Sequence, residues 1–211
     1  MALLSLAVEK EIIMSVLLAM GLYAFSMSIT PGPVNLIIFS KAINIGVGRT
    51  LPFVLGATIG FCSVLFSAGL GLGLLVKQYI WLTNLIAMLG CGFIFYLAIQ
   101  FFKSDSNLEF SSKSQLGFWS GSALMLLNPK AWLAAVAGTS LFVEKGQLSQ
   151  LILFVSIYSV ICFISLSLWA VLGKKMSDTF SLSRYIVHLN RVTGVLLMGV
   201  CCYVLVGLSF N

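Results

Sequence analysis

The sequence predicts an all-α membrane protein with six transmembrane helices, and three observations support that fold class. Hydrophobic residues make up 60% of the 211 positions and charged residues only 9%, whereas a soluble domain is roughly 45–50% apolar and 25% charged. Windows of about twenty apolar residues, each long enough to span a bilayer, follow one another with short connections. Proline-containing breaks interrupt two of these windows.

The expected spans leave almost no sequence outside the membrane. The first is too long for the apolar core of a cleavable signal peptide, and its short head carries the charges of Glu9, Lys10 and Glu11. The longest polar connection, residues 103–117, is too short to form a domain. We therefore expect a single membrane-embedded domain over residues 1–211. The spans are residues 12–39, 51–76, 79–102, 118–143, 148–173 and 187–209.

Lysine and arginine in the connections predict the orientation of the chain. The connections after the first, third and fifth spans are richer in these residues than the opposite side, so we expect them in the cytoplasm and both termini outside. The net charge of +6 comes from scattered basic residues, which do not indicate a nucleic-acid partner. The basic residues of the cytoplasmic side are Lys41, Arg49, Lys103, Lys113, Lys174, Lys175, Arg184 and Arg191, and those opposite are Lys10, Lys77 and Lys145.

The chain divides into two halves of three spans each, residues 12–102 and 118–209. An odd number of spans per half predicts two inverted repeats, the plan of many secondary transporters. The first helix of each repeat is broken, at Pro31-Gly32-Pro33 and at Asn128-Pro129. Threonine and asparagine are good N-cap residues and proline is favoured at the first helical position, so Thr30 and Asn128 predict the start of a half-helix inside the membrane.

Lys130 follows the second break near the middle of an apolar stretch, roughly 18 Å from either interface at 1.5 Å per residue. A lysine there costs roughly 2.5–3.5 kcal/mol on insertion scales, which makes it a functional-site hypothesis. The two half-helix N-termini would converge near the midplane and, with Lys130, bind a carboxylate. Packing kinks are the alternative explanation of the prolines. The candidate site residues are Thr30, Pro31, Gly32, Pro33, Asn35, Asn128, Pro129 and Lys130.

Several segments together resemble the LysE/RhtB family of amino-acid exporters. These are Ser28-Ile29-Thr30-Pro31-Gly32-Pro33-Val34-Asn35, then Gly46, Gly48-Arg49 and Gly56-Ala57-Thr58-Ile59-Gly60, and finally Leu127-Asn128-Pro129-Lys130-Ala131-Trp132. The resemblance implies an exporter of small amino acids or their derivatives in the bacterial inner membrane, driven by the proton gradient. Many family members carry an acidic residue just after the glycine that Gly60 matches, and a proline near residues 138–142. Lacking both, the chain looks more like the branch that exports cysteine and O-acetylserine.

The expected spans contain no Asp or Glu, which bears on the substrate. A cationic substrate would need a carboxylate at the dry midplane, whereas the ammonium of a zwitterion needs only carbonyls, an amide of Asn35 or Asn128, or an aromatic face such as Trp132 or Tyr23. We therefore expect neutral amino acids, similar to cysteine and O-acetylserine or to homoserine and threonine. Lys130 is the candidate for proton coupling, because burial favours its neutral form and an arriving carboxylate favours the charged one.

Other function classes have less support in the sequence. A divalent-metal exporter would need carboxylates, histidines or thiolates inside the membrane. A thiol-redox carrier would need cysteines that meet, and only Cys201 and Cys202 are close in sequence. No acid pair, Gly-x-Ser-x-Gly or His-Glu-x-x-His motif indicates an enzyme, and we expect no metal or cofactor. The cysteines lie in apolar runs and are interpreted as buried hydrophobes: Cys62, Cys91, Cys162, Cys201 and Cys202.

The expected partners are a small amino-acid substrate, protons and the lipid bilayer, and the chain would work as a monomer or homodimer. Small residues four apart permit close helix packing, within one subunit or at a dimer face. His188 is expected at the interface, and Lys41 and Arg49 anchor the first connection or guide an anionic group. The glycine pairs are Gly56/Gly60, Gly69/Gly73 and Gly117/Gly121, and polar residues that line a cavity or cross-link helices are Tyr23, Asn84, Tyr96 and Tyr158.

Overall fold

The computed structural model describes residues 2–72, 78–103, 117–179 and 183–209, and these residues contain helices but no strand. The all-α fold class is thereby confirmed. Three residues of the sequence analysis lie outside the described residues. These are Gly73 and two lysines that were counted for the expected orientation, Lys77 and Lys113. The elements are α1 (Ala2–Ile29), α2 (Pro33–Ser67), the π-helix η1 (Ala68–Leu72), α4 (Ile80–Lys103), α6 (Phe118–Leu126), α7 (Pro129–Phe142), α8 (Leu148–Thr179) and α9 (Ser183–Ser209).

Three segments of the described chain are long and apolar enough to cross a membrane: Lys10–Ile29, Pro33–Gly71 and Leu148–Thr179. The segments Asn84–Ile99 and Val187–Cys202 are shorter apolar helices. Helix α4 coincides with the third expected span to within one residue at each end, whereas α8 extends six residues beyond the fifth span and α9 begins four residues before the sixth. The fourth expected span is divided between α6 and α7, at the predicted break.

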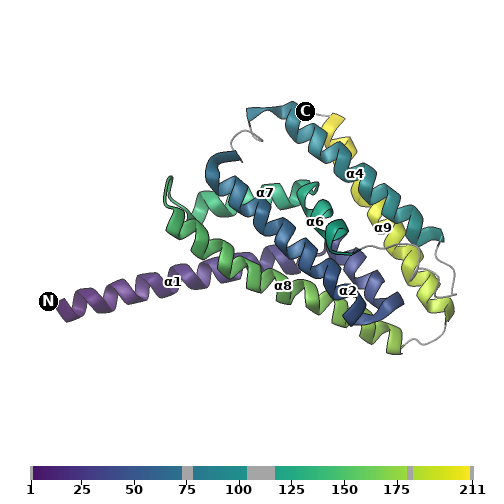
Figure 1. The fold of residues 1–211 in the computed structure, drawn as a ribbon, viewed down its shortest axis with the longest axis horizontal. Coiled ribbons are helices and arrows are strands. Elements are labelled where there is room, and N and C mark those ends of the chain that lie inside the picture. The colour runs from purple at the N-terminus through teal and green to yellow at the C-terminus, as the bar shows by residue number, and fades with distance from the viewer. Residues whose placement is uncertain (1, 73–77, 104–116, 180–182, 210–211) are drawn as a thin grey trace.

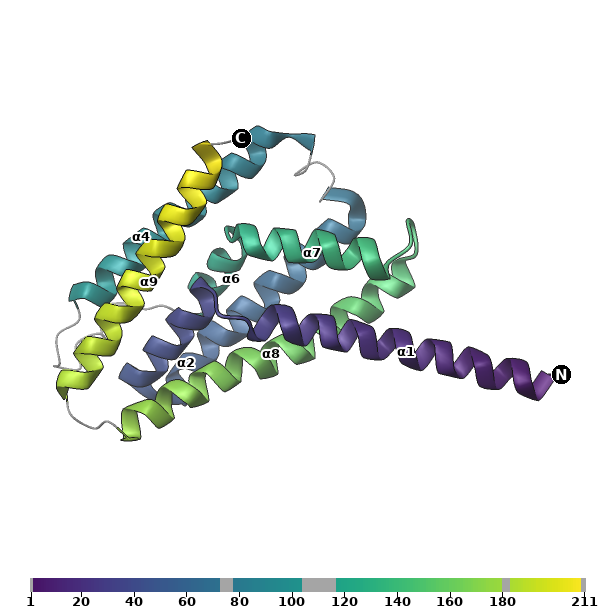
Figure 2. The same ribbon diagram turned by 180° about the vertical axis from the view of Figure 1, so that it is seen from behind.

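The connection expected between the first and second spans, residues 40–50, contains a turn that divides α2 into two helical parts. The turn is shorter than expected, because only Gly46 departs from helical geometry, with φ of 79° and ψ of 170°. Glycine adopts positive φ without steric penalty because it has no Cβ. A single residue therefore changes the direction of the chain, and the two parts of α2 run in different directions (Figure 2).

Helix α2 is the centre of the packing, with α8 and α6 against it, while α4 and α9 pair with each other (Figure 1). The N-terminal part of α1 extends away from the other helices, and its C-terminal part reaches the bundle beside α8. Large side chains with almost no exposed surface fill the interior, among them Phe53, Phe154, Tyr158, Leu97 and Leu197. This core fixes the positions of the two helix breaks relative to one another.

Helices α2 and α6 approach each other so closely that glycine is required on both. A Cβ atom at Gly56 would lie 1.9 Å from the carbonyl oxygen of Phe118, and one at Gly121 would lie 2.2 Å from that of Phe53. Ser122 strengthens the contact, because its hydroxyl donates a hydrogen bond to the Gly56 carbonyl at 2.8 Å. These two glycines therefore serve packing within one subunit, one of the two interpretations that the sequence left open.

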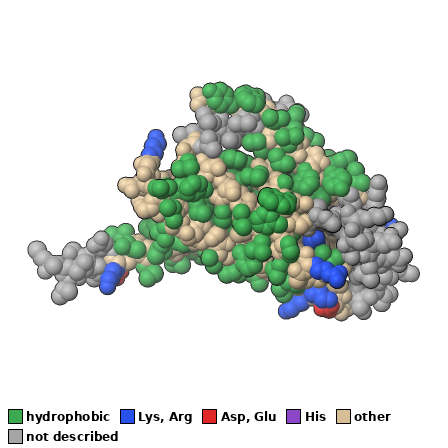
Figure 3. Space-filling model, viewed as in Figure 1, with side chains coloured by type: hydrophobic (Ala, Val, Ile, Leu, Met, Phe, Trp, Pro, Cys, Tyr) green, Lys and Arg blue, Asp and Glu red, His purple; other side chains and the backbone are tan. Residues whose placement is uncertain are grey.

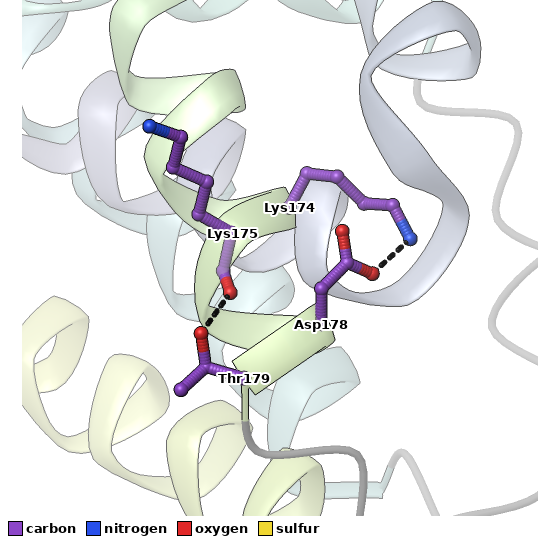
Figure 4. A network of polar contacts seen from close by, with 4 residues as sticks. All are labelled: Lys174, Lys175, Asp178 and Thr179. Atoms are coloured by element: carbon purple, nitrogen blue, oxygen red, sulfur yellow. Dashed lines mark hydrogen bonds and ion pairs between the residues drawn. The ribbon is translucent and has the colours of Figure 1, made fainter.

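The surface agrees with a membrane environment. Hydrophobic side chains cover most of the described part of the face in Figure 3, and Lys and Arg gather near the end of α8. There Lys174 forms an ion pair with Asp178 at 2.6 Å, and the Thr179 hydroxyl donates to the Lys175 carbonyl at 2.9 Å (Figure 4). Charged and polar groups at this helix end suit a position at the aqueous interface.

Candidate functional site

The chain leaves helical geometry after α1 because proline interrupts it twice. Pro31 and Pro33 have no backbone N–H, so the last carbonyls of α1 lose donors that a continuing helix would supply. Side chains from three other helices replace them. Asn35 donates to the Ser28 carbonyl at 2.8 Å, Trp169 to the Ile29 carbonyl at 3.1 Å, and Lys130 to the Thr30 carbonyl at 3.1 Å. The break is thus held from α2, α8 and α7 at once.

The structure corrects the expected role of Thr30. It is not the N-cap of the following helix, because α2 begins only at Pro33 and its N-cap is Gly32, which offers no side-chain cap. The Thr30 hydroxyl instead donates to the Ser26 carbonyl, four residues back on α1. Thr30 therefore contributes its carbonyl to the site, and the N-terminus of α2 has no side-chain acceptor to satisfy its first N–H groups.

The second break follows the prediction closely. Helix α6 ends at Leu126 and α7 begins at Pro129, with Asn128 in extended geometry as its N-cap. The Asn128 side chain accepts a hydrogen bond from the Lys130 N–H at 3.0 Å. Trp132 of α7 ties this helix to the end of α6, since its indole N–H donates to the Leu126 carbonyl at 2.8 Å. These contacts fix the start of α7 and with it the base of the Lys130 side chain.

The two breaks meet at a small cavity. About 40 Å³ inside it is open to the centres of water-sized spheres, which is room for roughly three waters. Gly32 and Asn35 reach it from one break, and Asn128 and Lys130 from the other. Lys130 and Gly32 lie close together, because a Cβ atom at Gly32 would be 3.4 Å from the Lys130 Nζ. The convergence expected from the sequence is therefore present in the fold.

The other expected site residues lie outside the lining. Thr30, Pro31, Pro33 and Pro129 are not among the cavity residues, and they act through the backbone, by ending one helix and starting the next. Among the residues that line the cavity, Lys130 has the only formal charge at neutral pH. The full lining is Met27, Ser28, Gly32, Val34, Asn35, Phe61, Met125, Asn128, Lys130, Ala131, Ala134, Tyr158, Cys162 and Leu166.

One wall of the cavity consists of residues that the sequence reasoning did not assign to the site. Phe61 of α2 stacks on Tyr158 of α8 with ring centroids 4.4 Å apart. Ser28 comes from the end of α1, and Cys162 lies one helical turn beyond Tyr158. The sequence indicates only that Tyr158 and Cys162 lie on one face of α8, since residues four apart in a helix share a face. Tyr158 appears in the sequence analysis only among the polar residues that line a cavity or cross-link helices.

Four polar side chains outside the cavity lining cross-link the helices in two places. The Tyr23 hydroxyl donates to the Ala134 carbonyl of α7 at 2.7 Å, so this tyrosine ties α1 to α7. Ser40 and Asn44 of α2 both bond to the Asn190 side chain of α9, at 2.6 and 2.9 Å. These contacts join α1 to α7, and α2 to α9, through buried or partly buried polar groups.

The structure also brings together Cys91 and Cys201, a pair that the sequence does not predict. The Cys91 thiol of α4 lies 3.9 Å from the Cys201 carbonyl, and the Cys201 thiol of α9 lies 3.5 Å from the Cys91 carbonyl. Both are buried and reduced. Neither lines the cavity. Within the described residues, no three His, Cys, Asp or Glu side chains gather in a way that could hold a metal ion.

Comparison with known proteins shows which family the sequence resembles. The family profile described as LysE type translocator matches residues 25–208. The cysteine/O-acetylserine efflux protein of Escherichia coli is 27% identical over 193 residues, which are 87% of this chain and 94% of the relative. Its namesake in Salmonella typhimurium is 27% identical over 179 residues, 83% of this chain and 90% of the relative.

A shorter match completes the comparison. The protein of the same name from Klebsiella pneumoniae is 30% identical over 122 residues, which are 57% of this chain and 62% of the relative. No solved structure matches the chain significantly. Because the family profile spans both helix breaks and nearly all of the described helices, this chain belongs to the LysE type translocator family.

Proposed function

We propose that this protein exports small neutral amino acids or their derivatives from the cytoplasm, similar to cysteine and O-acetylserine or to homoserine and threonine. The observation that carries the proposal is the meeting of both helix breaks and Lys130 at one cavity. The curated relatives bear the name of an efflux protein for cysteine and O-acetylserine, which supports the same substrate class.

The substrate carboxylate would bind at the start of α2. This helix has no side-chain cap, so the N–H groups of its first turn are available to an anion. The Lys130 ammonium lies beside the same N-terminus, next to Gly32. A carboxylate placed there would meet a positive charge, the positive end of a helix dipole and unpaired donors together.

Lys130 would change partners when the substrate arrives. Without substrate it donates to the Thr30 carbonyl at 3.1 Å and so bridges the two breaks. A hydrogen bond from an ammonium to a carboxylate is stronger than one to a neutral carbonyl. Binding therefore draws Lys130 toward the substrate and loosens the bridge, which links occupancy of the site to movement of α7 against α1. Export would be coupled to the entry of protons into the cytoplasm, as an antiport.

The transport cycle would be alternating access between two inverted repeats, residues 12–102 and 118–209. The directions of two helices support this assignment, since α4 and α9, the last helices of the two repeats, run antiparallel (Figure 2). We place the protein in the bacterial inner membrane as a monomer or homodimer, with both termini on the periplasmic side. The cavity would open alternately to each face as the repeats rock around the breaks.

Thiol-redox transfer is a second candidate, because Cys91 and Cys201 face each other across α4 and α9. This function needs both thiols, whereas amino-acid export needs neither. A Cys91→Ala/Cys201→Ala variant separates the two candidates. Export of amino acids by this variant at the wild-type rate would remove the thiol pair from the transport reaction.

The function is tested with purified protein in liposomes that contain a mixture of the common amino acids, homoserine and O-acetylserine. Efflux is measured by mass spectrometry with the external solution acidic relative to the lumen and again without a gradient. We expect a few small neutral amino acids to leave, and only with the gradient. Strong export of arginine without any neutral amino acid would refute the proposed substrate class, and efflux that ignores the gradient would refute antiport.

A further inference from the structure

Ser28 carries a buried hydroxyl that makes no hydrogen bond of good geometry, although Tyr158 and Cys162 are within its reach. The residue is 8% exposed and its backbone carbonyl is already held by Asn35, yet its Oγ makes no hydrogen bond of acceptable geometry. An unpaired buried polar group is destabilising, and it calls for an explanation such as a ligand that is bound during function. Two other described serines share this condition, Ser165 and Ser167, but neither lines the cavity.

The surroundings of Ser28 define a small polar patch on an otherwise apolar wall. The Tyr158 hydroxyl and the Cys162 thiol lie next to the Ser28 hydroxyl. Phe61, stacked on the Tyr158 ring, forms the adjoining aromatic surface. This patch and the start of α2 with Lys130 belong to the same cavity. A molecule held by its carboxylate at the α2 N-terminus would therefore extend its side chain toward Ser28.

We propose that Ser28, with Tyr158 and Cys162, forms the subsite for the substrate side chain and selects small side chains that carry one uncharged polar group. This inference rests on the proposed function and specifies its substrate class. A hydroxyl, thiol or ester group in the substrate pairs with the Ser28 hydroxyl, which can both donate and accept. An aliphatic side chain of the same size leaves that hydroxyl buried and unpaired, and a site built for hydrogen bonding rejects such an analogue.

The charge of the patch narrows the class further. The patch contains no ionised group, so a charged side chain would lose its water without gaining a counter-ion. Serine, cysteine and homoserine meet this condition, whereas arginine and glutamate do not.

The test compares each polar amino acid with an apolar analogue of the same length. Liposomes that contain the wild-type protein are loaded with equal amounts of serine, 2-aminobutyrate, homoserine and norvaline, and all four efflux rates are measured together. Ser28→Ala is the variant, and Ser165→Ala is the matched control, because it removes another buried hydroxyl without a hydrogen bond, outside the cavity.

We expect the wild type to prefer serine over 2-aminobutyrate and homoserine over norvaline. Ser28→Ala should lower these preferences by about three- to tenfold, the range that corresponds to one hydrogen bond, and Ser165→Ala should leave them unchanged. Both variants should unfold at a temperature no lower than the wild type, since each loses an unsatisfied hydroxyl.

The outcomes separate this inference from the proposed function. The subsite would be overturned if amino acids are exported but Ser28→Ala leaves the preference for polar over apolar analogues unchanged. It would also be overturned if Ser165→Ala changes this preference equally. Reduced thermal stability of Ser28→Ala would also overturn it, because the hydroxyl would then be paired within the protein. Failure of the wild type to export any amino acid would instead overturn the proposed function on which the subsite rests.

Discussion

Replacing Gly121 by alanine tests whether the close approach of α6 and α2 positions the second helix break. The new Cβ atom would lie 2.2 Å from the carbonyl oxygen of Phe53 and 2.8 Å from the backbone nitrogen of Ala57. Non-bonded heavy atoms in contact are roughly 3.5 Å apart, so the two helices must separate by about 1 Å or more. Both obstructing atoms belong to the backbone, and no side-chain rotation relieves the clash.

The expected change in stability follows from two opposing effects. Overpacking a tight interface typically costs about 1–3 kcal/mol, and the clash with rigid backbone places this substitution near the upper end. Alanine is favoured over glycine within a helix by about 1 kcal/mol. We therefore expect Gly121→Ala to lower the free energy of unfolding by about 2 kcal/mol. The Ser122 hydrogen bond to the Gly56 carbonyl should weaken as well, since it crosses the same contact.

The assay is unfolding of the purified protein in mixed micelles with increasing SDS, followed by circular dichroism. Gly92→Ala is the matched control, because this helical glycine on α4 has nothing within 4 Å of its added Cβ atom, and alanine should raise stability there. Gly121→Ala should also reduce export, since α6 leads directly into Asn128. If both variants were equally stable, the close packing of α2 on α6 would be refuted.

Two further predictions concern the breaks themselves. Asn128→Ala removes the N-cap of α7 and should lower stability by about 1 kcal/mol, whereas Asn128→Ser, which can still cap the Lys130 N–H, should retain most of it; equal midpoints of SDS unfolding would contradict the cap. Gly32→Ala should fold normally, because φ of −158° at this position is open to any residue, but should slow export several-fold, because its methyl group would lie 3.4 Å from the Lys130 Nζ. Wild-type export by Gly32→Ala would contradict the carboxylate site placed there.

The helix breaks were predictable from sequence because proline acts locally. Its missing N–H and fixed φ end one helix and favour the start of the next wherever it occurs. The third expected span agrees with α4 to within one residue at each end for a similar reason, since the length of the apolar run sets it. The C-terminus of α8 and the N-terminus of α9 were not predicted, because these helices continue to Thr179 and from Ser183, beyond the apolar runs. The extent of the turn between the two parts of α2 was not predictable. The sequence predicts a connection over residues 40–50, but it does not show that Gly46 alone leaves helical geometry.

Only part of the site was predictable from sequence. Contacts between residues close in sequence were predictable, and contacts between distant residues were not. Asn128, Pro129 and Lys130 are adjacent, so the cap of α7 was evident. The donors to the carbonyls at the first break were not, because Trp169 and Lys130 reach them from 140 and 100 residues away. Ser28 gave no sequence signal either, since a serine within an apolar helix gains significance only when the fold leaves its hydroxyl unpaired beside a cavity.

The central claim is that Lys130 binds the substrate carboxylate where the two breaks meet, and gradient-driven export by Lys130→Met tests it most directly. Wild type, Lys130→Met and Lys175→Met are reconstituted at equal protein density in liposomes loaded with neutral amino acids, with an acidic exterior. Lys175 is an exposed lysine near the end of α8, nine residues beyond the cavity residue Leu166. We predict that Lys175→Met exports like the wild type, and that Lys130→Met inserts and folds but exports nothing above protein-free liposomes. Proton-dependent export by Lys130→Met at the wild-type rate would contradict the account.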